Sequence, residues 1–285
     1  MIRLLLLSLL ALAPVPTNAP RVSYQHRPAT TTTATTAVPQ RIVSLSPMVT
    51  ETLFALGVGG AVVGVTRYCD KPAAASSLPK IGGYTDVSLE AVLALRPDLV
   101  IAQNGQGQWP VLDRLRDRGI AVLIIFNDTV EESLLAINAL GVVVDEPSAA
   151  QPIIDRQRAA LAAAHGSAGA IRVAVVVGVQ PLVVAGTNSF ADTAVRATGA
   201  TSAVADSDPA WPVWSLETLL ARRVDVIVVA DGVASVPALQ KMVAGLGARA
   251  PQIIASDHAI LMRPGPTFAD DVDTLAVLLA KASPK

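Results

Sequence analysis

The sequence predicts an α/β protein of two like-folded lobes, each built on a central parallel sheet, joined by a helical connector. Three observations support this prediction. Residues 88–102 recur as residues 215–229, at an offset of about 127 residues. Runs of β-branched residues alternate with helical patterns on both sides of the middle of the chain, which is typical of parallel sheets covered by helices. Residues 129–164 show helical spacing alone.

Length and composition exclude some classes of protein. A chain of 285 residues can form two domains, each with its own core. A formal charge of -1 without a basic run argues against nucleic acid as a partner. An aromatic content of 4% argues against a surface on which bases stack.

The N-terminus has the pattern of a secretory signal. Arg3 precedes the apolar run 4–13, which is too short to span a bilayer, so residues 1–19 are interpreted as a signal peptide. The alternative is an uncleaved anchor. Residues 20–39 contain a threonine run, have no periodicity and are expected to form a disordered tether. The mature chain is therefore not expected to be an integral membrane protein.

Residues 40–128 are predicted to form the first lobe. In order, its expected elements are strand 41–45, a helix from Thr50 that Gly57 ends, strand 61–65, the first repeat copy with its helix and strand 99–102, helix 110–118 and strand 121–126. Within each repeat copy, Ser88 or Ser215 is a helix N-cap, and an acid follows in the first turn, where the helix dipole favours it.

The remainder divides into a connector and a second lobe. Residues 129–168 are predicted to be helical, and residues 169–285 return to alternating strands and helices. The expected elements of the second lobe are strand 172–177, a loop and short strand 181–186, helix 189–198, the second repeat copy, a helix from Pro237, a strand near 253–254 and a last helix 268–280 capped by Thr267 with Asp270.

Ligands of open α/β sheets bind at the carboxyl ends of the strands, on the loops that follow. Most of the tryptophans and tyrosines fall on such loops: Tyr68, Tyr84, Trp109, Trp211 and Trp214. Tyr84 and Trp211 also occupy equivalent places in the two halves. This placement favours an aromatic cleft between the lobes, and the alternative is ordinary packing.

Patterns of catalysis and metal binding are missing from the sequence. There is no Gly-x-Ser-x-Gly elbow, phosphate-binding loop or dinucleotide fingerprint. The three histidines lie far apart, so no metal cluster and no cofactor are expected. The lone Cys69 is interpreted as a packing residue. Arg263 is either a solvated charge or a ligand contact.

Five motifs, at residues 41–51, 64–72, 78–83, 88–100 and 211–217, are together specific for one protein family. In these motifs the chain resembles the helical-backbone periplasmic substrate-binding proteins of importers for cobalamin, haem and ferric siderophores. The resemblance implies a monomer in the periplasm, two lobes bridged by one long rigid helix over residues 145–164, and delivery of a ligand to the permease dimer of an ABC transporter. It also implies that Glu90 and Glu217 dock onto arginines of the two permease halves.

The cobalamin-binding branch of that family looks most similar. Its cleft aromatics match Tyr84 and Trp211, each six residues before a glutamate, and a further tyrosine matches Tyr68. Asp257 and Arg263 fall near an Asp–Arg pair that contacts the ligand there. The chain departs from the pattern at Gln103, where a tryptophan is expected, and in the loop 181–185, which lacks a phenylalanine. A corrinoid is therefore the first expectation, haem or a ferric siderophore the second, and an enzyme on this fold a distant third.

Overall fold

A computed structural model describes residues 37–105, 109–168, 170–205, 208–257 and 259–282. These described residues all belong to one compact unit. The predicted signal peptide and nearly all of the predicted tether lie outside the described residues. Within the described ranges, no helix combines the length and the apolar character that crossing a bilayer requires.

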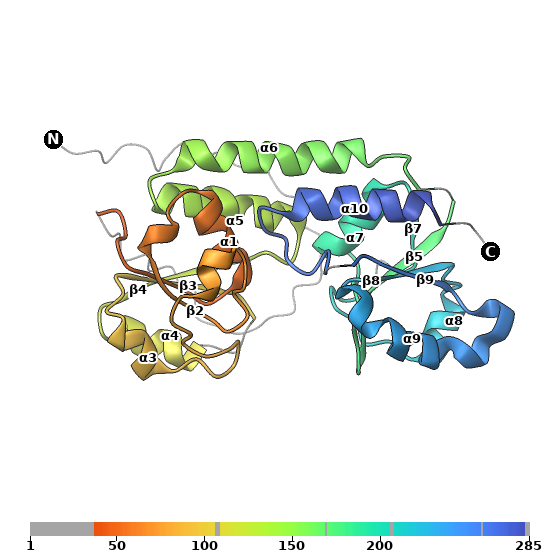
Figure 1. Ribbon diagram of the computed structural model, residues 1–285, viewed down its shortest axis with the longest axis horizontal. Coiled ribbons are helices and arrows are strands. Elements are labelled where there is room, and N and C mark those ends of the chain that lie inside the picture. Colours follow the sequence, from red (N-terminus) through yellow and green to blue (C-terminus); the bar gives the residue numbers. More distant parts are fainter. Residues whose placement is uncertain (1–36, 106–108, 169, 206–207, 258, 283–285) are drawn as a thin grey trace. The chain divides into compact units, whose positions relative to one another are not determined.

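The first sheet is fully parallel, with the strand order β2-β1-β3-β4 (Figure 1). Its strands are β1 (Ile42–Ser44), β2 (Val62–Val65), β3 (Leu99–Gln103) and β4 (Ala121–Ile125). The helices and turns that follow them are α1 (Pro47–Ala55), η1 (Gly59–Ala61), α2 (Ala73–Ser76), α3 (Leu89–Ala94) and α4 (Trp109–Arg116).

Helix α1 begins at Pro47 and not at Thr50, which corrects the expectation from the sequence. Proline is well placed in the first turn, because the backbone donor that it lacks would have no partner inside the helix. The Thr50 hydroxyl donates to the carbonyl of Ser46 and to the Ser44 hydroxyl, at 3.1 and 2.8 Å. Thr50 therefore anchors the helix to the end of β1.

The second sheet has the order β6-β5-β8-β9, and β7 also pairs with β5. Its elements are β5 (Arg172–Val179), β6 (Leu182–Val184), α7 (Phe190–Ala197), β7 (Thr201–Ser202), α8 (Leu216–Ala221), β8 (Val226–Val229), η2 (Gly232–Ser235), α9 (Val236–Val243), η3 (Ala244–Arg249), β9 (Gln252–Ala255) and α10 (Phe268–Ala280). Strand β6 is antiparallel to β5, an exception to the predicted parallel sheet. Only Gln180 and Pro181 separate the two strands, and so short a connection permits antiparallel pairing alone.

Equivalent hydrogen bonds in the two copies confirm the internal repeat. Ser88 and Ser215 each accept a hydrogen bond from the backbone three residues later, at 3.2 Å in both lobes. Asp98 accepts from the backbone N–H of Arg41 at 3.1 Å, and Asp225 accepts from that of Arg172 at 2.7 Å. The same local sequence therefore fastens helix, turn and strand together in both lobes.

The connector consists of two helices, α5 (Val130–Val143) and α6 (Pro147–Ala163). Thr129 and Glu132 form a capping box at the start of α5. The long helix expected over 145–164 begins two residues late because Asp145 has a φ of 62°, which no right-handed helix accommodates. Figure 1 shows α6 running beside α5 and α10.

Helix α10 has the predicted bounds, but its predicted cap is wrong. The Thr267 side chain makes no capping bond, and its backbone carbonyl accepts from Asp270 N–H at 2.9 Å. One apolar cluster runs from β1 and β3 through α5 and α6 to β5, β8 and α10, with Ile42, Ile137 and Phe268 among its fully buried members. This shared core holds the carboxyl ends of the two sheets in place around the site.

Candidate functional site

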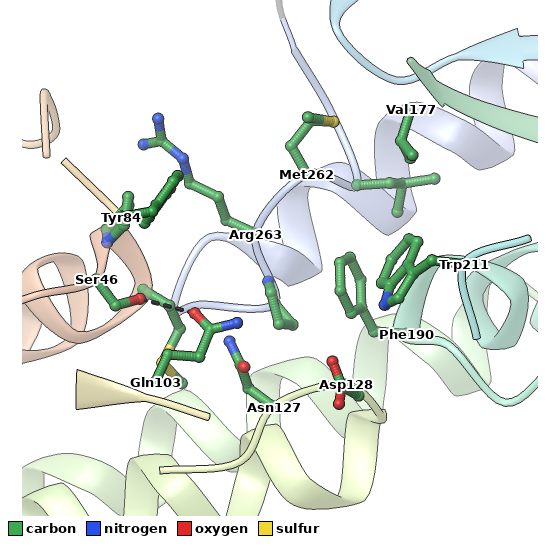
Figure 2. Close-up of a pocket in the computed structure, with 14 residues that line it drawn as sticks. Ser46, Tyr84, Gln103, Asn127, Asp128, Val177, Phe190, Trp211, Met262 and Arg263 are labelled. Carbon is green, nitrogen blue, oxygen red and sulfur yellow. Dashed lines mark hydrogen bonds between the residues drawn. The ribbon is translucent and has the colours of Figure 1, made fainter. Parts of the chain in front are cut away.

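A cavity of about 300 Å³ lies at the carboxyl ends of strands from both sheets (Figure 2). Its walls come from three parts of the chain. The first lobe contributes Ser46, Pro47, Met48, Tyr84 and Gln103, the segment between β4 and α5 contributes Asn127 and Asp128, and the second half contributes Val177, Phe190, Trp211, Leu261, Met262, Arg263 and Pro264. Most of these residues follow a strand, as expected for a ligand site at the carboxyl ends of the strands.

The two aromatics that the repeat relates, Tyr84 and Trp211, both line this cavity. Tyr84 stacks on Tyr68, with ring centroids 4.4 Å apart and planes at 15°. Trp211 packs against Phe190, with ring centroids 5.4 Å apart. Burial raises the pKa of the Tyr84 hydroxyl, so this group is a protonated hydrogen-bond donor at neutral pH. Tyr68 is partly exposed and extends the aromatic surface beyond the cavity wall.

Trp214 does not line the cavity, and its predicted role as a ligand contact is wrong. Its side chain is only 6% exposed and belongs to the apolar core of the second lobe, with the Arg222 guanidinium 5.7 Å above its ring. The segment around Pro212 and Trp214 is extended and hydrogen-bonds to β6. Val184 N–H donates to the Pro212 carbonyl, and Trp214 N–H donates to the Leu182 carbonyl. Side chains three positions apart on extended backbone face opposite sides, so Trp211 and Trp214 point apart.

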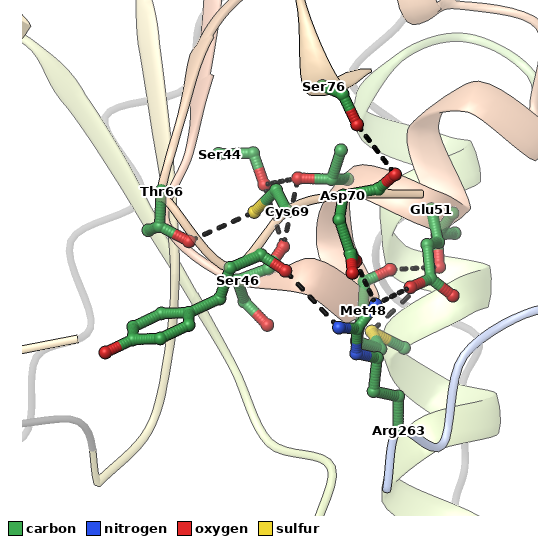
Figure 3. A network of polar contacts seen from close by, with 12 residues as sticks. Ser44, Ser46, Met48, Glu51, Thr66, Cys69, Asp70, Ser76 and Arg263 are labelled. Carbon is green, nitrogen blue, oxygen red and sulfur yellow. Dashed lines mark hydrogen bonds and ion pairs between the residues drawn. The ribbon is translucent and has the colours of Figure 1, made fainter. Parts of the chain in front are cut away.

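Trp109 is the first residue of α4, and its side chain lies outside what the structure describes. Asp257 is exposed in the loop after β9, accepts a hydrogen bond from the Ser256 hydroxyl, and does not line the cavity. Of Asp257 and Arg263, which the resemblance places near the ligand, Arg263 lines the cavity. Arg263 contacts Glu51 at 2.7 Å and Asp70 at 2.8 Å, and it donates to the Tyr68 carbonyl at 3.3 Å (Figure 3).

These contacts largely neutralise Arg263. Burial raises the pKa of Glu51, and the hydrogen bond and charge of Arg263 offset that rise only in part. For Asp70, partial burial opposes ionisation, but the hydrogen bond and charge of Arg263 prevail and lower its pKa. With two carboxylates beside one guanidinium, this corner of the cavity has no surplus positive charge for an anionic ligand.

Several wall residues were not predicted as site residues. Ser46 donates to Gln103 Oε1 at 2.9 Å, and both belong to loops that the carboxyl-end rule selects. Asn127 and Asp128 follow β4, so the same rule could have found them. Phe190 opens helix α7, and no local pattern in the sequence marks it as a wall residue.

Glu90 and Glu217 are exposed in the first turns of α3 and α8, away from the cavity wall. The Ser215 hydroxyl lowers the pKa of Glu217 by hydrogen bonding. Cys69 is buried, with its sulfur 3.1 Å from the Thr66 hydroxyl, which agrees with a packing role. Among the described residues, no three His, Cys, Asp or Glu side chains are grouped to hold a metal ion.

Comparisons with known proteins agree with this architecture. Residues 42–253 match the periplasmic binding protein family. A vitamin B12-binding protein of Pectobacterium carotovorum subsp. carotovorum (strain PC1) is 30% identical over 213 residues, which cover 72% of this chain and 77% of that protein.

Two solved structures share the fold. A periplasmic heme-binding protein from Pseudomonas aeruginosa has a TM-score of 0.73 and 28% identity, over 87% of this chain and 95% of its own. The periplasmic vitamin B12 binding protein of Vibrio cholerae has a TM-score of 0.69 and 24% identity, over 85% and 96% of the two chains. This chain therefore belongs to the periplasmic binding protein family, whose members carry solutes to ABC importers and are not enzymes.

Proposed function

We propose that this protein captures cobalamin or a related corrinoid between its two lobes and delivers it to an ABC importer. The observation that supports this most directly is the placement of Tyr84 and Trp211, which come from equivalent positions of the two lobes and line one cavity. The relatives named vitamin B12-binding proteins favour the same ligand.

A corrinoid is a large ligand with apolar edges, which aromatic rings can cover from both lobes. Each buried aromatic removes on the order of 150–250 Å² from water, worth about 4–6 kcal/mol before the costs of binding. A cavity of about 300 Å³ is at the small end of ligand pockets. A corrinoid would fill it with one edge and extend outward along Tyr68.

The charges beside the cavity favour a ligand of low net charge. Arg263 is engaged by Glu51 and Asp70, and Asp128 adds a further carboxylate to the wall. An anionic ferric siderophore would face these carboxylates without a matching surplus of guanidinium groups. A siderophore is therefore less well suited to this site than a corrinoid.

Haem is the second candidate. The solved haem-binding relative from Pseudomonas aeruginosa supports it, as do the side chains Tyr84, Met48 and Met262 at the cavity. A phenol and two thioethers are groups that can bind haem iron. The haem proposal requires one of them to reach the iron.

For delivery, we propose that a monomer docks on the permease dimer through Glu90 and Glu217, one acid from each lobe. The carboxylates project from matched helix starts, and exposed acids of this kind fix orientation and speed encounter more than they add affinity. Export would depend on residues 1–19 acting as a signal peptide.

Absorption spectroscopy distinguishes the ligands. Purified protein is incubated separately with cobalamin, haem and ferric siderophores, freed of unbound ligand and scanned. The corrinoid proposal expects cobalamin bands to stay with the protein in about equimolar amount. A retained Soret band without retained cobalamin would establish the haem alternative, and retention of an iron chelate alone would overturn both.

A further inference from the structure

One wall of the cavity is polar, although the rest is mostly apolar and aromatic. This wall, here called the amide wall, consists of Gln103, Asn127 and Asp128. Strands β3 and β4 are neighbours in which Gln103 pairs with Ile125, two residues before Asn127. The carboxyl ends of these two strands therefore bring two carboxamides and one carboxylate to the same surface (Figure 2).

A hydrogen bond from Ser46 sets the orientation of the Gln103 carboxamide. Ser46, which is fully buried, donates its hydroxyl to Gln103 Oε1 at 2.9 Å. The Ser46 backbone carbonyl in turn accepts from the hydroxyls of Ser44 and Thr50, at 3.0 and 3.1 Å. Because the carbonyl end of Gln103 is held by Ser46, its amino end is turned to the cavity side (Figure 2).

Asn127 supplies an independent observation. The residue is only 3% exposed, yet within the described ranges no hydrogen bond engages its carboxamide. The bond that it receives from the Ser133 hydroxyl, at 3.5 Å, goes to its backbone carbonyl. Within the described ranges, the Asn127 carboxamide atoms are not among the polar atoms sealed from solvent without a partner, so they reach the cavity that the residue lines. A carboxamide that faces a cavity without a protein partner is available to hydrogen-bond a ligand.

The charge at this wall favours a neutral partner. The Asp128 carboxylate can accept a hydrogen bond but repels an anion, and Phe190 and Trp211 adjoin it without adding a cation. Arg263, the cationic wall residue within the described ranges, already contacts Glu51 and Asp70. A ligand group that both donates and accepts hydrogen bonds while carrying no charge complements the Asn127 carboxamide and the Asp128 carboxylate.

We propose that Gln103, Asn127 and Asp128 form a subsite for a primary carboxamide of the ligand and select it over a carboxylate. The Asn127 amino group donates to the carbonyl oxygen of the ligand amide, and the Asp128 carboxylate accepts from its nitrogen. Gln103 borders the subsite from the end of β3. The proposal rests on the proposed function, since the rim of cobalamin carries primary carboxamides whereas haem carries carboxylates.

Calorimetric titration at neutral pH tests the subsite with cobalamin and with its monocarboxylic acids, in each of which one peripheral carboxamide is a carboxylate. For wild type, at least one acid should bind more weakly than cobalamin by about tenfold or more. Asp128→Asn keeps the shape of the side chain and removes its repulsion of a ligand carboxylate. This variant should therefore show a smaller difference in affinity between cobalamin and that acid. Asn127→Ala should weaken cobalamin binding by about tenfold.

Asn138→Ala is the matched control, because Asn138 is an exposed residue of α5 outside the cavity wall, and it should bind like wild type. Circular dichroism melts show whether each variant is folded, and Asp128→Asn carries the test if Asn127→Ala does not fold. Equal affinity of wild type for cobalamin and every acid would overturn the subsite alone. Absence of cobalamin binding to wild type would overturn the proposed function and the subsite with it.

Discussion

Arg263 and Glu51, 212 residues apart in the sequence, form an ion pair at 2.7 Å that joins the segment before α10 to helix α1 of the first lobe (Figure 3). The Glu51 side chain is 4% exposed and that of Arg263 is 29% exposed. The C-terminal segment is therefore fastened to the first lobe beside the cavity, in addition to the covalent link through α5 and α6.

Removing Arg263 should leave Glu51 as a buried charge without its main partner. We expect Arg263→Ala to lower the free energy of unfolding by about 2–3 kcal/mol, below the usual cost of breaking a fully buried pair because Arg263 is partly exposed. Urea unfolding measures this value. Arg156→Ala breaks the exposed pair with Asp270 and should cost less than about 1 kcal/mol. Similar losses for the two variants would contradict a special role for Arg263.

Glu51 should also leave a signature in the pH dependence of stability. Because its pKa is raised in the folded chain, the folded state takes up this proton first, and the contribution to stability increases as pH falls. The unfolding free energy of wild type minus that of Glu51→Gln should therefore grow between about pH 7 and pH 4.5. Asp70, whose pKa is lowered, acts in the opposite direction but is present in both proteins. A difference that stays flat or shrinks would mean that Arg263 dominates the titration of Glu51.

Trp211 and Trp214 should behave oppositely although they are three residues apart. Trp211→Ala should weaken cobalamin binding by about tenfold or more and lower stability by about 1 kcal/mol, because the contact with Phe190 is lost. Trp214→Ala should cost about 3–5 kcal/mol of stability, because it empties a core position. Its folded fraction should bind cobalamin like wild type. Titration calorimetry measures the cobalamin affinity of both variants, and chemical unfolding measures their stability. A normal affinity for Trp211→Ala would show that this ring is not part of the site.

The docking proposal predicts a separation of binding from delivery. Glu90→Ala with Glu217→Ala should keep ligand affinity, shift the melting temperature little because both side chains are exposed, and sharply reduce stimulation of the importer ATPase in vesicles. Glu131→Ala is the control, because Glu131 is an exposed acid in the first turn of α5. Weaker ligand binding with normal stimulation per bound complex would assign the two acids to the ligand site instead.

Two connections between the lobes predict that the lobes move little relative to each other. A packed helical connector and the Arg263 contacts with Glu51 and Asp70 oppose the wide hinge closure seen in binding proteins with flexible links. X-ray scattering curves of the free and the cobalamin-loaded protein should superimpose. A clear decrease in the radius of gyration on loading would show that the lobes close.

The repeat could be recognised from sequence because its information is local. Ser88 and Ser215 cap helices through bonds to their own first turns. Asp98 and Asp225 occupy matched places in the two copies, although they accept from the backbone of Arg41 and Arg172, which lie 57 and 53 residues earlier. Hydrophobic periodicity likewise depends on neighbours along the chain, which is why helix α10 has the predicted bounds. The equivalence of Tyr84 and Trp211 followed from the constant offset, and the structure brings both rings to one cavity.

The partners of individual side chains depended on contacts between distant segments. Trp211 and Trp214 are alike in sequence, and only the pairing of their segment with β6 turns one to the cavity and the other into the core. Arg263 contacts Glu51 because the segment before α10 reaches the first lobe, and no local pattern encodes a contact across 212 residues. The sequence by itself determined the two lobes and their matched aromatics, because propensity and periodicity are local. The tertiary structure alone decided which side chains meet at the cavity, because that depends on how distant elements pack.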